Sequence, residues 1–219
     1  QGGGGVPRTD LAWAETRLAE LLHGAGELSR AADLIEHALE HTEAEDVSAR
    51  AERIRVRAML QEARGDMAAA RAGVEQALGL LAGATSEAER VAALGLRRYQ
   101  GWLCYRDGDV ESAQKCFEGL LTEIPETETG LMGLAYTGLG LVHYRRAEHA
   151  EAQRSFESAL GRFEEADNPR GIVSSYINLG LVSFRMGEVR EAINWSEKAV
   201  RLHAKRGDRV ALAQVYNNL

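Results

Sequence analysis

Two stretches of the sequence carry nearly the same pattern forty residues apart. Residues 179–200 read LGLVSFRMGEVREAINWSEKAV, and residues 139–160 read LGLVHYRRAEHAEAQRSFESAL. In both stretches apolar residues recur at intervals of three and four, which is the period of an amphipathic helix. A short turn signal interrupts this period near the middle of each stretch. The sequence therefore predicts a helical hairpin that is repeated along the chain.

The turn signal occurs five times and sets the register of the whole chain. Its central positions are separated by 39, 43, 39 and 40 residues, and they are Gly26, Gly65, Gly108, Ala147 and Gly187. An alanine follows each of them five residues later: Ala31, Ala70, Ala113, Ala152 and Ala192. A second small or medium residue comes seven positions after that: Ala38, Ala77, Leu120, Ala159 and Ala199. Between the two stands a large residue, which is Ile35, Val74, Phe117 or Phe156, whereas Ser196 takes that position in the last repeat. Small residues let two helices approach closely, and a large residue fills the space beside them.

The rest of the composition also favours helices. The three prolines, Pro7, Pro125 and Pro169, all fall between the periodic segments, where the missing N–H breaks no helix. We therefore expect an all-α fold of five hairpins, followed by a single helix over 208–219. The hairpins are predicted at about 9–43, 46–82, 85–123, 127–165 and 168–206. Residues 1–8, which include QGGGG, are expected to be a flexible lead or an expression remnant.

The repeated motif resembles the tetratricopeptide repeat, with aromatic-x2-Leu-Gly in the first helix and Ala-x3-large-x2-Ala in the second. The fourth hairpin carries Tyr136 with Leu139-Gly140, and the fifth carries Tyr176 with Leu179-Gly180. The first three hairpins read Leu18-Ala19, Arg57-Ala58 and Gln100-Gly101 at the Leu-Gly position, so they are assigned through the turn and alanine spacing. The resemblance implies a right-handed α-solenoid, in which each hairpin buries its apolar face against the next one. The period near 40 is similar to the longer repeats of Leu-Gly-Asn-type scaffolds, kinesin light chains and maltose-regulator-type bacterial sensor arrays.

The resemblance also implies a concave groove that is lined by the first helices and holds a segment of a partner protein. Asn178 matches an asparagine that bonds the backbone of a bound peptide in the longer-repeat families. The twelve groove positions that the resemblance assigns to this sequence are Arg98, Trp102, Tyr105, Arg106, Thr137, Leu141, Tyr144, Arg145, Asn178, Leu181, Phe184 and Arg185.

An aromatic residue precedes an arginine once in each of three repeats, at 105–106, 144–145 and 184–185. Arginine binds carboxylates through two parallel hydrogen bonds, and aromatic side chains supply large contact areas at interfaces. The pattern thus predicts a peptide partner with acidic and apolar residues. In the alternative interpretation, each aromatic residue packs inside its own hairpin and each arginine lies at a helix C-terminus, where it is favoured by the helix dipole.

Composition narrows the remaining classes of partner. The net charge of −7 argues against a nucleic-acid binder, and no apolar run approaches the roughly 20 residues of a membrane span. Two cysteines are typical of a reducing compartment, which favours the cytoplasm. We expect Cys104 and Cys116 to pack in the core, although the sequence does not exclude a disulfide between them.

No motif predicts catalysis or a cofactor. The sequence contains no GxGxxG fingerprint, no GxxxxGK[ST] loop and no HExxH helix. His37 and His41 have a spacing that suits a metal, but the sequence offers no convincing third ligand, so no metal site is predicted. The chain is therefore expected to be no enzyme.

Two functions remain open at this point. The first is a protein-interaction module or scaffold that binds a peptide segment in its groove. The second is the regulatory sensor array of a larger signalling ATPase or transcription activator, which binds a small ligand or gates a switch. In addition, the helix expected at 208–219 presents an apolar stripe that predicts self-association or a longer array; the stripe comprises Val210, Leu212, Val215, Tyr216 and Leu219.

Overall fold

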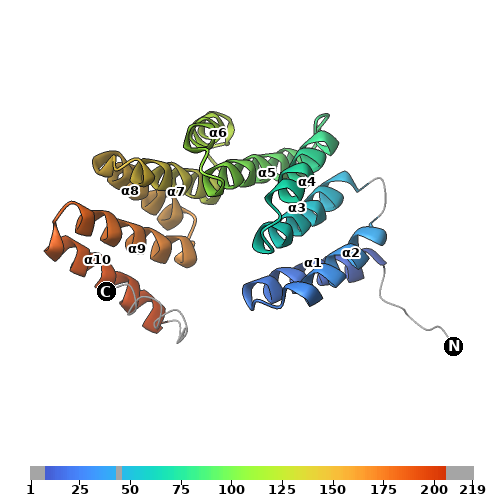
Figure 1. Cartoon of the computed structure of the whole chain (residues 1–219), viewed down its shortest axis with the longest axis horizontal. Coiled ribbons are helices and arrows are strands. Elements are labelled where there is room, and N and C mark those ends of the chain that lie inside the picture. The colour runs from blue at the N-terminus through green and yellow to red at the C-terminus, as the bar shows by residue number, and fades with distance from the viewer. Residues whose placement is uncertain (1–7, 43–45, 206–219) are drawn as a thin grey trace. The chain divides into compact units, whose positions relative to one another are not determined.

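The computed structural model describes residues 8–42 and 46–205, and over these residues it consists of ten α-helices with no strand (Figure 1). The all-α repeat fold that the sequence predicts is confirmed. The helices are α1 (Arg8–Gly24), α2 (Leu28–Glu40), α3 (Val47–Ala63), α4 (Met67–Leu80), α5 (Glu87–Arg106), α6 (Val110–Glu123), α7 (Thr129–Arg145), α8 (His149–Glu165), α9 (Pro169–Arg185) and α10 (Val189–Lys205). Residues 1–7 of the predicted lead and the predicted helix over 208–219 lie outside the described residues.

The chain divides into two compact units, Gln1–Leu103 and Cys104–Leu219, with the boundary inside α5. In the first unit α1 packs on α2, α2 on α3 and α3 on α4, and α1 also contacts α3. In the second unit the helices from α6 to α10 pack in chain order, and α7 also contacts α9. Each unit therefore places the first helices of successive hairpins side by side.

The turns between paired helices have one recurrent geometry. Gly65 has a φ of +86°, and the N–H of the next residue, Asp66, donates to the carbonyl of Gln61 at 2.9 Å. This hydrogen bond is typical of a helix that ends at a residue in the left-handed conformation. Glycine adopts that conformation most easily. Gly26, Gly108 and Gly187 repeat it, and Ala147 adopts a φ of 60° in the equivalent turn. Asp66 also begins α4, because its side chain accepts a hydrogen bond from the N–H of Ala69.

The alternation of small and large residues forms the core. Ala152, Phe156 and Ala159 of α8 are at most 1% exposed, and Ala152 and Phe156 pack with Leu179 and Val182 of α9. The ring of Phe156 occupies the position that a Cβ at Gly140 would take, at 2.4 Å from its Cε1. The glycine of the Leu-Gly pair is thus explained by the large residue that faces it from the second helix.

Among the described residues, no helix is both long and apolar enough to cross a membrane.

Candidate protein-binding surface

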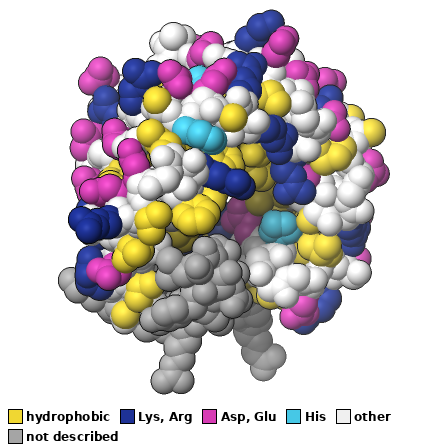
Figure 2. Space-filling view, turned by 60° about the vertical axis from the view of Figure 1, so that its left-hand side comes forward, with side chains coloured by type: hydrophobic (Ala, Val, Ile, Leu, Met, Phe, Trp, Pro, Cys, Tyr) yellow, Lys and Arg dark blue, Asp and Glu magenta, His cyan; other side chains and the backbone are white. Residues whose placement is uncertain are grey.

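The second unit brings three of the predicted aromatic–arginine pairs onto the side formed by the first helices. They stand at the end of α5, the end of α7 and the end of α9. We call this region the ladder surface, and it comprises Tyr105, Arg106, Thr137, Leu141, Tyr144, Arg145, Asn178, Leu181, Phe184 and Arg185. In Figure 2 hydrophobic and basic side chains adjoin one another on the face of the molecule that is shown.

The arginine of one repeat stacks on the tyrosine of the preceding repeat. The guanidinium carbon of Arg145 lies 3.8 Å from the centre of the Tyr105 ring, and its Nη1 donates a hydrogen bond to the carbonyl of Tyr105. A guanidinium at this distance over a ring is attracted to the negative face of the π system, by about 0.5–1 kcal/mol at an exposed site. The contact therefore links α7 to the end of α5.

Arg185 and Tyr144 form a related contact one repeat later, in which the hydrogen bond goes to the tyrosine hydroxyl. The guanidinium carbon of Arg185 lies 6.0 Å from the centre of the Tyr144 ring, and its Nε donates to the Tyr144 hydroxyl at 2.9 Å. The ring centre of His149 lies 5.9 Å from the ring centre of Tyr144. Tyr144 itself is half-buried against the core of α8 and α9. Both tyrosines thus serve as platforms for an arginine of the next repeat.

The apolar side chains at the end of α9 remain exposed. Phe184 is 63% exposed and Leu181 is 43% exposed, whereas Leu141, at the same repeat position as Leu181, packs against the core of α8 and α9. Asn178 is half-buried, and Thr137 uses its hydroxyl to donate to the carbonyl of Gly133 at 2.8 Å. The end of α9 is therefore the part of the ladder surface with the most apolar area open to contact.

The two remaining predicted residues, Arg98 and Trp102, belong to the first unit. Trp102 donates from Nε1 to Glu62 at 3.2 Å, and Tyr99 donates its hydroxyl to the same carboxylate at 2.8 Å. Burial and this acidic neighbour raise the pKa of Tyr99 well above its usual range. Burial also lowers the pKa of Arg98, and the positive charge of Arg55 lowers it further.

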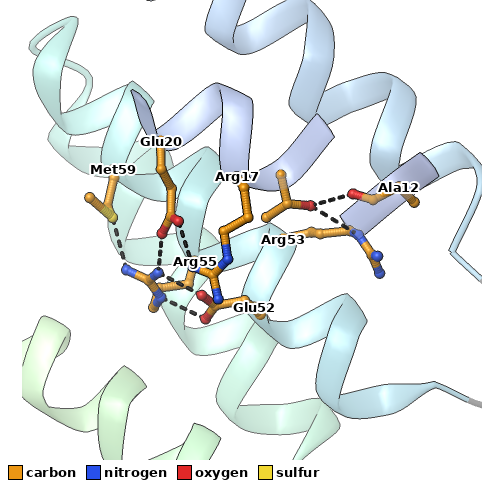
Figure 3. Close-up of polar contacts among 8 residues, drawn as sticks. Ala12, Arg17, Glu20, Glu52, Arg53, Arg55 and Met59 are labelled. Atoms are coloured by element: carbon orange, nitrogen blue, oxygen red, sulfur yellow. Dashed lines mark hydrogen bonds and ion pairs between the residues drawn. The ribbon is translucent and has the colours of Figure 1, made fainter. Parts of the chain in front are cut away.

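Arg55 is the centre of a polar network between α1 and α3 (Figure 3). Its guanidinium contacts Glu20 of α1 at 2.8 Å and Glu52 of α3 at 2.7 Å, and its Nη1 lies 2.9 Å from the sulfur of Met59. Burial tends to raise the pKa of Glu52, but the hydrogen bond and the charge of Arg55 outweigh this and lower it overall. Arg55 thus links α1 to α3 through carboxylates of both helices.

The cysteines and histidines that the sequence offered for a disulfide or a metal site contact other groups of the protein. Cys104 and Cys116 are half-buried thiols that form no disulfide, and burial raises the pKa of the Cys116 thiol. His37 lies 2.7 Å from Glu15, and His41 contacts the carbonyl of His37 at 2.8 Å. In the part of the chain that the structure describes, no three His, Cys, Asp or Glu side chains gather as a metal site would require.

The contact of an arginine with the tyrosine of the preceding repeat was not predicted from the sequence. The pattern of aromatic and arginine residues predicted either a groove contact, or packing inside one hairpin with the arginine at a helix terminus. The available signal was the spacing itself, since residues 105, 144–145 and 185 lie one repeat apart. Two side chains separated by one repeat become neighbours only once adjacent hairpins stack.

Comparison with known proteins agrees with this architecture. Residues 131–205, which span α7 to α10, match the family model of the tetratricopeptide repeat. A relative by sequence is Superkiller complex protein 3 of Mus musculus, which is 31% identical over 118 residues, covering 52% of this chain and 7% of that protein. The chain thus spans a small part of that much longer relative.

Two solved structures match most of the chain. The Rap conjugation gene regulator of the plasmid pLS20, in complex with the Phr* peptide, has a TM-score of 0.80 at 20% identity, covering 93% of this chain and 56% of that one. A signal transduction ATPase with numerous domains and a tetratricopeptide repeat sensor, from Pyrococcus horikoshii, has a TM-score of 0.69 at 14% identity, covering 94% and 31%. At these identities the similarity establishes the helical-repeat fold.

Proposed function

We propose that the chain is a non-catalytic interaction module, which binds a peptide segment of a partner protein on the ladder surface. The observation that carries the proposal is a pair of contacts between an arginine and the tyrosine of the preceding repeat: Arg145 stacks on Tyr105, and Arg185 donates a hydrogen bond to the Tyr144 hydroxyl. The Rap regulator with a similar fold was solved with a peptide bound, which supports a peptide as the class of ligand.

The stacked arginines are suited to acidic side chains for a physical reason. An arginine that is already held by a ring and by one hydrogen bond loses less conformational entropy when it binds a carboxylate. Arg145 and Arg185 both remain exposed in this arrangement. The exposed Leu181 and Phe184 lie on the same helix as Arg185, so the proposed peptide combines acidic residues with apolar ones. Asn178 carries an amide that both donates and accepts, as pairing with an extended peptide backbone requires.

Selection from a random peptide library on the full chain tests the proposal. We expect the selected peptides to be enriched in Asp and Glu next to Leu, Ile or Phe. The variant Arg106→Glu, Arg145→Glu, Arg185→Glu should bind a selected peptide at least about tenfold more weakly, which corresponds to about 1.4 kcal/mol. Affinity is measured by fluorescence anisotropy after circular dichroism has established equal helix content.

A matched variant controls for the change in net charge. Arg154, Arg190 and Arg201 are exposed residues of α8 and α10, and reversing all three changes the charge by the same amount. This control should bind the peptide within about twofold of the original chain, because these helices lie outside the ladder surface. Equal losses in the two variants, or a selection without acidic residues, would refute the proposal.

A second candidate function is the sensor array of a larger signalling ATPase. It is favoured by the similarity to the tetratricopeptide repeat sensor of the Pyrococcus horikoshii protein, of which this chain spans 31%. We also propose a cytoplasmic location, since neither cysteine forms a disulfide and reduced thiols persist in reducing compartments.

A further inference from the structure

A pocket of about 250 Å³ lies in the first unit, and none of its lining residues belongs to the ladder surface. It is formed by the start of α1, the end of α2 and the start of α3. Its lining includes Asp10, Trp13, His41, Thr42, Asp46 and Arg53. This volume is smaller than the roughly 300–1,000 Å³ of pockets for drug-sized ligands, so the pocket suits a molecule of only about a dozen heavy atoms.

Arg53 is a buried cation with unused hydrogen-bonding capacity. Its side chain is only 5% exposed, and a single hydrogen bond, from Nε to the Thr16 hydroxyl at 3.2 Å, holds its guanidinium (Figure 3). Thr16 in turn donates to the carbonyl of Ala12 at 2.7 Å, which fixes the hydroxyl. Among the described residues, no group accepts a hydrogen bond from Nη1 or Nη2 of Arg53, and no carboxylate lies within ion-pair distance.

The two outer nitrogens of Arg53 are not among the fully buried atoms without a hydrogen-bond partner, so a ligand in the pocket can reach them. Burial holds the pKa of Arg53 below its usual range, although Asp46, Glu15 and Glu52 act in the opposite direction from a greater distance. Asp46 is partly engaged, because its carboxylate caps α3 by accepting from the N–H of Ala49 at 2.9 Å. The two outer nitrogens of Arg53 therefore present the parallel donor edge that a carboxylate ligand fits.

Other lining groups accept hydrogen bonds or offer apolar contact. Asp10 is exposed at the start of α1, and its carboxylate oxygens accept hydrogen bonds. His41 directs Nδ1 to the carbonyl of His37 at 2.8 Å, so in the neutral ring Nδ1 carries the hydrogen and Nε2 is an acceptor. Trp13 is 61% exposed and gives the pocket an aromatic wall. The pocket thus combines the cationic donor Arg53, a carboxylate acceptor, an imidazole acceptor and an apolar surface.

We propose that this pocket binds a free α-amino acid with an apolar side chain. Its carboxylate pairs with the outer nitrogens of Arg53, its ammonium group is bound by Asp10 and His41, and its side chain packs on Trp13. A simple dianion is disfavoured, because Asp10 and Asp46 add negative charge to the same lining. The site is independent of peptide binding on the ladder surface.

Calorimetric titration of the full chain with L-phenylalanine and two fragments tests the assignment. The fragments are 3-phenylpropionate, which lacks the amine, and 2-phenylethylamine, which lacks the carboxylate. We expect L-phenylalanine to bind at least about tenfold more tightly than either fragment. If L-phenylalanine does not bind, or if 3-phenylpropionate binds equally well, the assignment is wrong.

Variants separate the contributions of the two ends of the ligand. Arg53→Lys keeps the charge but removes the parallel donor edge, and it should weaken L-phenylalanine at least about tenfold. Asp10→Asn changes an exposed side chain that the fold does not depend on; it should weaken L-phenylalanine but leave 3-phenylpropionate unchanged. Leu21→Ala, on the same helix and 72% exposed, is the control and should bind like the original chain. Loss in all three variants, or in none, would contradict the proposed contacts.

Discussion

At the scale of single residues, the turn at Ala147 departs from the other turns of the same type. Ala147 has a φ of 60°, where Gly26, Gly65, Gly108 and Gly187 stand in the equivalent turns. An L-residue with a side chain is strained in this region, and glycine is not. The sequence predicted these turns from their glycines, and it assigned Ala147 to the same position through spacing alone. What the sequence did not give is the backbone strain, because spacing says nothing of φ.

We therefore expect Ala147→Gly to stabilise the chain by about 0.5–1 kcal/mol, since the relief of strain exceeds the added entropy of the unfolded chain. The midpoint of thermal unfolding should rise by about 1–4 °C, as followed by circular dichroism. Ala150→Gly is the control, because Ala150 is exposed and helical in α8, and it should lower the midpoint instead. A lower midpoint in both variants would mean that Ala147 is not strained.

At the scale of helices, the pairing of small and large residues was predictable because it follows one period along one chain. Buried Ala152, Phe156 and Ala159 confirm it. The contacts of Arg145 with Tyr105 and of Arg185 with Tyr144 were not predictable, because they depend on how far neighbouring hairpins are offset when they stack. The same holds for the pocket at Arg53, to which three helices contribute.

The packing of first and second helices leads to a prediction about two glycines at the same motif position. A Cβ at Gly140 would come within 2.4 Å of the Phe156 ring, whereas a Cβ at Gly180 would meet its nearest atoms at 3.4 Å. Ser196 stands in the fifth hairpin where Phe156 stands in the fourth, and this explains the difference. Gly140→Ala should destabilise the chain by about 1–3 kcal/mol, and Gly180→Ala by less than about 1 kcal/mol. Urea unfolding measures both, and equal losses would contradict the packing argument.

At the scale of the whole molecule, the two compact units imply that stability is local. In helical-repeat proteins each repeat contacts only its neighbours, so stability is approximately a sum of local terms. Leu179 is fully buried in the second unit, and Leu179→Ala should cost about 2–5 kcal/mol. We expect amide hydrogen exchange, followed by mass spectrometry, to become faster in α7 to α10 and to stay unchanged in α1 to α4. Leu60→Ala, at a residue 1% exposed in α3, should give the reverse pattern. Equal acceleration in both units by either substitution would mean that the chain unfolds as a single cooperative structure. The proposed independence of the pocket from the ladder surface would then lose its physical basis.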